Sequence, residues 1–171
     1  DEEREFERLP CVVYLHGNSS SRCEAVSEVK YLLPMNITFF AFDFAGCGKS
    51  EGDYISLGWY ERDDVACVIE YLRKTNKVST IGLWGRSMGA ATTMIYAHRD
   101  ERIKAICMDS PFADFIRLAK ELTLKQINLP GFLINTVLNI IRKTILGKNG
   151  LDIDKLKPID SASKTFQPAI F

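Results

Sequence analysis

The chain has 171 residues, which is the usual size of a single domain. Hydrophobic residues make up 46% and charged residues 26%, a globular composition that excludes collagen-like, coiled-coil and disordered chains. Lysine plus arginine equals aspartate plus glutamate at 22 each, so no excess of positive charge favours nucleic acid as a partner. We therefore expect one domain over residues 1–171, with residues 1–8 as a solvated, acidic lead-in.

The five cysteines are widely spaced and include no Cys-x-x-Cys pair. This spacing argues against a disulfide framework or a structural zinc site, and we expect no metal and no cofactor. Cys11, Cys67 and Cys107 lie in apolar runs and are expected to be buried, reduced thiols. Reduced thiols are typical of the cytoplasm, and the apolar runs are far shorter than the roughly 18 residues that span a bilayer.

Short apolar runs alternate with segments of helical periodicity along the chain. Apolar residues recur at three- and four-residue spacing over 26–33 and again over 65–72, which predicts two amphipathic helices. The runs between and around them are β-branched or aromatic and bounded by Gly, Asp, Ser or Pro, which is typical of buried strands. The candidate strands are 11–16, 37–43, 80–84, 104–109 and a last one beginning near 168. This alternation predicts a parallel sheet with right-handed crossovers.

The alternation of strand and helix is interrupted after the fourth candidate strand. Two helix-like segments follow, and the second includes the very apolar run 129–141. We expect a helical insertion at 112–150, which is either a cap over a site at the sheet edge or an extra pair of packing helices. A membrane-surface helix is a third interpretation, disfavoured because few basic residues (Arg142, Lys143 and Lys148) flank the apolar run.

The most specific motif is Gly85-Arg86-Ser87-Met88-Gly89, which follows the candidate strand 80–84 and precedes a helix expected at 90–97. Strand, tight turn and helix are the context in which Gly-x-Ser-x-Gly forms a nucleophile elbow. The serine occupies a strained turn, and the flanking glycines let strand and helix approach it without a Cβ clash. The helix N-terminus favours negative charge that develops on a substrate oxygen. The motif therefore predicts Ser87 as a catalytic nucleophile.

A second motif, His16-Gly17-Asn18-Ser19-Ser20, ends the first candidate strand. Folds with a nucleophile elbow place the other half of the oxyanion hole there, so the backbone N–H groups of Asn18 and Met88 would converge on the oxyanion. One such donor is worth about 2.7–4 kcal/mol in a hydrolase transition state. For His16 itself we favour a structural hydrogen bond within this loop over a role as general base.

The segment 46–50, Gly-Cys-Gly-Lys-Ser, raises the alternative of a phosphate-binding loop. A Walker A motif needs a glycine five residues before the Gly-Lys pair, and that position is Asp43. A dinucleotide-binding Gly-x-Gly-x-x-Gly is also absent, because Glu51 stands at its sixth position. We expect a tight turn near the rim of the active site and no nucleotide.

Four features occur in one order: the strand ending at His16-Gly17, the 43–50 loop, the 85–89 elbow and the segment 109–112, Asp-Ser-Pro-Phe. Together they resemble the core of an α/β-hydrolase-fold serine hydrolase, in the branch of serine aminopeptidase-like hydrolases, esterases and acyl-protein thioesterase-like enzymes. The resemblance covers about residues 9–171. It implies an α/β fold, a mostly parallel sheet flanked by helices, and cleavage of an ester, thioester or peptide bond in a small-molecule, acyl or peptidyl substrate.

In this fold the triad runs Ser, then Asp or Glu, then His along the chain. After Ser87 the only histidine is His98, about 16 Å away along the helix, which is too far for a general base. We expect His98 to be exposed at the helix C-terminus, where positive charge suits the helix dipole. Asp109 is one place where related folds put the acid, but the resemblance implies an acid and a histidine beyond Phe171, so that the fold is incomplete here.

Two hypotheses follow from the missing histidine. In the first, the protein is a serine hydrolase, and this chain alone is nearly inactive because loss of the base histidine costs around 10⁶ in turnover. In the alternative, the protein is a non-catalytic hydrolase-fold module that binds a ligand or another protein. The strained serine of the elbow argues against the alternative, since it costs stability without serving chemistry.

Overall fold

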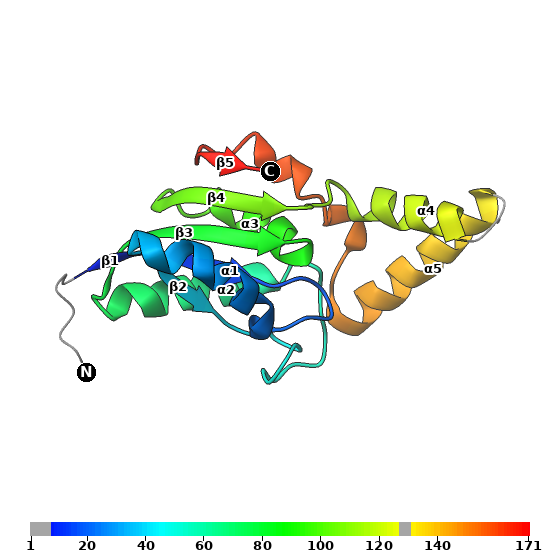
Figure 1. The fold of residues 1–171 in the computed structure, drawn as a ribbon. Helices are drawn as coiled ribbons and strands as arrows, with labels where there is room; N and C mark the ends of the chain where they lie inside the picture. Colours follow the sequence, from blue (N-terminus) through cyan, green and yellow to red (C-terminus); the bar gives the residue numbers. More distant parts are fainter. Residues whose placement is uncertain (1–7, 127–130) are drawn as a thin grey trace.

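The computed structural model describes residues 8–126 and 131–171 (Figure 1). The acidic lead-in and the beginning of the apolar run 129–141 lie outside these ranges. Within them, the strands form one sheet in the order β2-β1-β3-β4-β5, and every neighbouring pair is parallel. The strands are β1 (Leu9–Leu15), β2 (Thr38–Ala41), β3 (Val78–Arg86), β4 (Ile103–Asp109) and β5 (Ala169–Ile170). The α/β class and the parallel sheet are confirmed.

Helices connect the strands in the predicted order. The α-helices are α1 (Val26–Leu32), α2 (Glu61–Lys74), α3 (Met88–Ala97), α4 (Phe115–Gln126), α5 (Gly131–Asn149) and α6 (Ile159–Ala162). Short 3-10 helices lie at η1 (Arg22–Ala25), η2 (Leu33–Met35) and η3 (Ile153–Lys155). Because the connections from β1 to β2 and from β3 to β4 each contain a helix, successive strands run in the same direction and end at one edge of the sheet.

The hydrophobic core lies between the sheet and the helices α2 and α3. Val13, Leu15 and Leu83 of the sheet pack in this core with Val65 and Ile69 of α2. All ten residues of α3 are buried, so this helix is the centre of the fold. The hydroxyls of its buried residues Thr92 and Thr93 donate hydrogen bonds to backbone carbonyls one turn earlier in the helix. These polar side chains can therefore lie in the core at little cost in free energy.

The helix α1 covers the sheet much less completely. It buries none of its own residues, and Val26 remains 69% exposed. On the same side, Tyr14 packs against Phe39 and Trp84 with ring centroids 5.8 Å apart in both pairs. The expected apolar stripe over 26–33 is helical, but only part of it contacts the protein.

The cysteines are all free thiols, as expected. Cys11 is buried, and burial raises the pKa of its thiol to about 11. Cys107 is half-buried. The expectation that Cys67 is buried was wrong, because the buried stripe of α2 runs through Val65 and Ile69 and leaves Cys67 exposed.

The helical insertion is present as α4 and α5, which form an arm extending away from the sheet (Figure 1). The two helices pack on each other and on η3. Two hydrogen bonds attach the base of the arm: the Phe115 N–H donates to the Leu156 carbonyl at 3.1 Å, and the Tyr60 hydroxyl donates to the Asn149 carbonyl at 2.7 Å. A role of the insertion as a cap stays a prediction.

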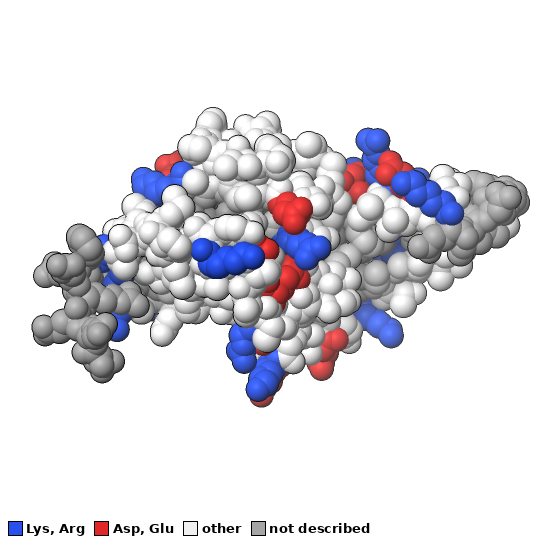
Figure 2. All heavy atoms as spheres, viewed as in Figure 1, with Lys and Arg blue, Asp and Glu red and all other residues white. Residues whose placement is uncertain are grey.

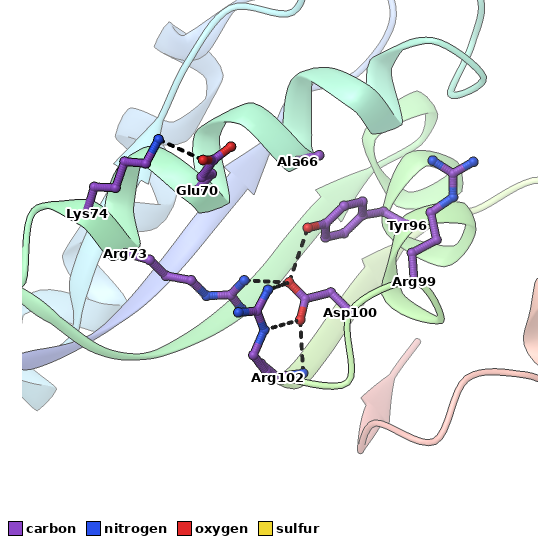
Figure 3. A pocket seen from close by; sticks show the side chains of 8 residues that line it. All are labelled: Ala66, Glu70, Arg73, Lys74, Tyr96, Arg99, Asp100 and Arg102. Carbon is purple, nitrogen blue, oxygen red and sulfur yellow. Dashed lines mark hydrogen bonds and ion pairs between the residues drawn. The ribbon is translucent and has the colours of Figure 1, made fainter.

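A cavity of about 560 Å³ lies between the C-terminal parts of α2 and α3 (Figure 3). In it the Asp100 carboxylate forms ion pairs with Arg73 at 2.6 Å and Arg102 at 2.9 Å, and accepts from the Tyr96 hydroxyl at 3.3 Å. Burial alone would raise the pKa of Asp100, but these donors hold it well below its usual value. Because the carboxylate is saturated with internal donors, we interpret the cluster as a clamp joining α2, α3 and β4.

The Asp100 clamp predicts a pH-dependent contribution to stability. Asp100→Asn should lower the free energy of unfolding by about 2 kcal/mol at neutral pH, because charged hydrogen bonds are lost. Because the pKa of Asp100 is lower in the native state than in the unfolded state, its ionised carboxylate stabilises the fold fully at pH values above the unfolded-state pKa of about 4. This stabilisation is lost progressively as the pH falls below that value. Urea unfolding at pH 7 and pH 3 should show a smaller difference between the two proteins at pH 3. Asp63→Asn, which breaks the exposed pair with Arg99, is the control with little effect; equal losses for both variants would contradict the clamp.

Candidate active site

Ser87 forms the turn between β3 and α3, with φ 50° and ψ −109°. This region of backbone conformation is disfavoured for a residue with a Cβ and costs of order 1–3 kcal/mol. The Ser87 N–H donates to the Asp109 carbonyl at 2.8 Å, and its carbonyl accepts from the Ala91 N–H at 2.9 Å. The turn is thus bonded to β4 on one side and to α3 on the other, while the Ser87 side chain is exposed to solvent.

The two glycines of the elbow are required by space. A Cβ on Gly85 would stand 2.2 Å from the Gly89 carbonyl oxygen. A Cβ on Gly89 would stand 1.9 Å from the Leu15 carbonyl oxygen. Both distances are far inside van der Waals contact, so α3 reaches the strand ends only because these positions have no side chain.

The sheet register brings the Asn18 loop to the elbow. Leu15 of β1 pairs with Gly85 of β3, so the residues that follow each strand emerge at the same edge. An added Cβ on Gly17 would lie 3.7 Å from the Arg86 carbonyl oxygen, which shows how close the two segments are. Asn18 itself is exposed.

The backbone N–H groups predicted for an oxyanion hole are free of protein partners. The Ser87 N–H is already bonded to β4, which leaves Met88, the first residue of α3, as the next donor. Among the residues that the structure describes, neither the Asn18 nor the Met88 N–H donates to a protein acceptor. Their role as an oxyanion hole stays a prediction.

His16 is fully buried and uses both ring nitrogens on the backbone. Its Nδ1 donates to the Gly17 carbonyl at 2.8 Å, and its Nε2 accepts from the Phe44 N–H at 3.1 Å. The ring also packs on the Phe44 ring at a centroid distance of 4.9 Å. His16 therefore holds the loop after β1 to the segment after β2, the structural role that we favoured, and has no nitrogen left for Ser87.

Asp43 connects the same two segments from the other side. Its carboxylate accepts from the Arg22 N–H at 2.6 Å and from the Lys49 N–H at 3.0 Å. Burial would raise the pKa of Asp43, but these donors and the Arg22 charge hold it below its usual value. A Cβ on Gly48 would lie 2.3 Å from this carboxyl group, so the segment 46–50 encloses the Asp43 carboxylate where a Walker A loop would enclose a phosphate.

Glu24 is a further positioning residue of the Asn18 loop, and the sequence analysis missed it. Its carboxylate accepts from the Tyr14 hydroxyl at 2.8 Å and from the Gly17 N–H at 3.3 Å. Burial would raise the pKa of Glu24, but hydrogen bonds, the largest from Ser20, and the charge of Arg86 hold it below its usual value. No local motif signals this contact, because it depends on the path of η1 past the end of β1.

The remaining candidates for a triad are His98 and Asp109. His98 closes α3 at the end opposite to Ser87. It is half-buried, so the expectation that it is exposed was wrong, and burial together with the Lys164 charge lowers its pKa. The Asp109 carboxylate is 3.6 Å from the Arg86 guanidinium and accepts from the Ser110 hydroxyl at 2.7 Å. Neither of the chain's two histidines is therefore placed to act as a base.

Comparison with known proteins identifies relatives of this arrangement. The family model for serine aminopeptidase, S33, a hydrolase family, matches residues 7–156. Bacillus subtilis (strain 168) protein YqkD is 27% identical over 163 residues, which are 94% of this chain and 52% of that protein. Lysophosphatidylserine lipase ABHD12 of Danio rerio is 28% identical over 131 residues, which are 72% of this chain and 34% of that protein.

A solved structure shows the same fold. The Pyrococcus furiosus esterase Pf2001 aligns with a TM-score of 0.64 and 28% sequence identity, over 78% of this chain and 55% of that one. The chain spans about half the length, or less, of the relatives that it matches.

The close packing of the elbow predicts a strong contrast between two glycines. Gly89→Ala should cost about 3 kcal/mol or more in the free energy of unfolding, or prevent folding, because backbone must move to admit the methyl group. Gly147→Ala is the matched control, since nothing lies within 4 Å of its Cβ position on α5. That variant should gain up to about 1 kcal/mol from helix propensity. Thermal unfolding of both variants measures this; a neutral Gly89→Ala would refute the account of the elbow.

Proposed function

The chain belongs to the serine aminopeptidase S33 family of hydrolases, with its esterase- and lipase-like members, and we propose that it carries the nucleophile and oxyanion hole of a serine hydrolase. In this proposal Ser87 is the nucleophile, and the backbone N–H groups of Asn18 and Met88 bind the oxyanion. The observation that carries the proposal is the exposed Ser87 at positive φ, tied by its backbone to β4 and α3. The positive φ of this serine costs folding free energy, and such strained residues are found mainly at active sites, which supports a catalytic role.

The reaction is acyl transfer to water in two steps. The Ser87 Oγ attacks the acyl carbon of the substrate as its proton passes to a general base, and the two N–H groups bind the oxygen that becomes negative. The carbon–leaving-group bond then breaks, and the leaving group departs with the proton. Water, deprotonated by the same base, attacks the acyl-serine and releases the acid and free Ser87.

The general base must come from outside the residues described above. His16 is occupied on both nitrogens, and His98 lies at the far end of α3. The relatives are about twice as long as this chain or longer, so we place the triad acid and histidine in the part of the protein that the chain does not span. The strand β5 pairs with β4 and leads toward the same edge as Ser87, which suits an acid on the loop that follows it.

We propose an ester as the scissile group, in preference to a thioester or a peptide bond. The support is the relationship to an esterase and to a lysophosphatidylserine lipase, at 28% identity in each case. The substrate would be a small molecule with an acyl group. The five free thiols favour a reducing compartment, and we assign the protein to the cytoplasm on that ground.

One observation favours the second candidate, a non-catalytic binding module of the same fold. Neither histidine is placed to activate the Ser87 hydroxyl, because His16 bonds backbone groups with both nitrogens and His98 lies at the far end of α3. The two candidates differ in whether the complete protein turns over an ester at Ser87.

Ser87→Ala in the product of the complete reading frame should lower kcat on p-nitrophenyl esters by about 10⁴- to 10⁶-fold, because the nucleophile is removed. Ser110→Ala is the matched control, since Ser110 is also an exposed serine at positive φ at the end of a neighbouring strand. It should retain most of the activity. Equal turnover by the parent protein and Ser87→Ala would support the binding module.

The 171-residue chain alone should hydrolyse the same esters about 10⁶-fold more slowly than the complete protein, because it brings no base to Ser87. Initial rates of both proteins at equal concentration measure the ratio. Robust turnover by the isolated chain that Ser87→Ala abolishes would show that the base lies within it, contrary to this account.

A further inference from the structure

The arm formed by α4 and α5 exposes a stripe of aliphatic side chains. On α5, Leu133, Val137, Ile140 and Ile141 recur at three- and four-residue spacing and therefore share one face. They are 39% to 61% exposed, whereas Ile134 on the adjoining face is 4% exposed. The apolar surface of α5 is thus wider than the part that contacts the protein, and half of it faces solvent.

The second helix of the arm also exposes two leucines, which lie two residues apart and therefore on opposite sides of α4. Leu122 and Leu124 of α4 are 48% and 58% exposed. Because α4 and α5 pack against each other and extend away from the sheet, the sheet does not cover these residues (Figure 1). An exposed aliphatic surface of this kind marks a site of interaction.

The arm is also strongly basic, unlike the chain as a whole. Residues 115–149 contain six lysine and arginine residues and a single acid, whereas the complete chain is neutral. Arg117 is paired with Glu121, and Arg142 is paired with Asp152 and Asp154. Among the described residues, four lysines of the arm have no ion pair: Lys120, Lys125, Lys143 and Lys148. In Figure 2 basic groups lie beside acidic ones along the upper edge of the arm.

The sequence alone disfavoured a membrane role because few basic residues flank the apolar run of α5. The fold changes this count, since α4 packs on α5 and Lys120 of α4 lines one hollow together with Arg142 of α5. Uncompensated lysines next to exposed aliphatic side chains are the composition of helices that bind at the surface of anionic membranes. No helix in residues 8–126 and 131–171 is long and apolar enough to cross a bilayer, so the arm would lie on the surface.

We propose that the arm, residues 115–125 and 133–149, docks on an anionic phospholipid surface. The exposed aliphatic side chains of α5 enter the boundary between headgroups and acyl chains, and the unpaired lysines bind lipid phosphates and carboxylates. The arm begins a few residues after Asp109, at the edge of the sheet where Ser87 lies. A bound arm would hold that edge close to the lipid.

Flotation with vesicles of phosphatidylcholine, with and without phosphatidylserine, tests the proposal on the product of the complete reading frame. The protein should bind the vesicles that contain phosphatidylserine, and added salt should release it. Lys143→Ala combined with Lys148→Ala should weaken this binding about 30-fold, at roughly fivefold or more for each lysine. Val137→Ser combined with Ile140→Ser should weaken it about tenfold or more, because less apolar area enters the lipid.

The matched control is Val26→Ser combined with Lys30→Ala on α1. Val26 is 69% exposed and Lys30 is exposed, so this pair removes the same chemistry from another surface helix. It should bind as the parent protein does, and so should Ser87→Ala, which separates the docking from the proposed catalysis. No binding to phosphatidylserine, equal losses for the arm and α1 variants, or a dimer held together by the arm would overturn the proposal.

Discussion

The approach of α3 to the ends of β1 and β3 is the constraint on which the rest of the structure depends. At Gly89 the helix backbone comes so close to Leu15 that a methyl group does not fit. Since α3 is wholly buried and packs on three strands, it cannot move away to relieve this contact. The chain therefore turns sharply at Ser87, and the strain of positive φ there is balanced by the packing of the whole helix.

The loops around Ser87 are held by polar groups that work inside the protein. His16, Glu24 and Asp43 each accept or donate hydrogen bonds to backbone groups of loops that leave β1 and β2. These hydrogen bonds hold the loop after β1 in place, because its residues Gly17, Asn18 and Ser19 have no large apolar side chain to pack in the core. The lysine-containing segment after Asp43 illustrates this, because its Lys49 N–H donates to the Asp43 carboxylate of the same chain. Within residues 8–126 and 131–171, the Asn18 N–H in the loop after β1 donates to no backbone carbonyl.

The strands, their order along the chain and the sharp turn at Ser87 between β3 and α3 could be predicted from the sequence, because each rests on a local pattern of side chains. The positions that were wrong depend on contacts between distant segments. Cys67 lies in an apolar run, but its angular position on α2 turns it toward solvent. His98 ends a helix, but Lys164 and local burial oppose its protonation. The roles of Glu24 and Asp100 likewise arise from partners that only the fold brings together.

We propose that this packing presents Ser87 as a nucleophile. Peptide mapping by mass spectrometry after treating the product of the complete reading frame with a fluorophosphonate tests it most directly. The account predicts one phosphonylated residue, Ser87, and protection of that residue by a competing ester substrate. An unmodified Ser87, or a label carried by another residue such as Ser110, would contradict it.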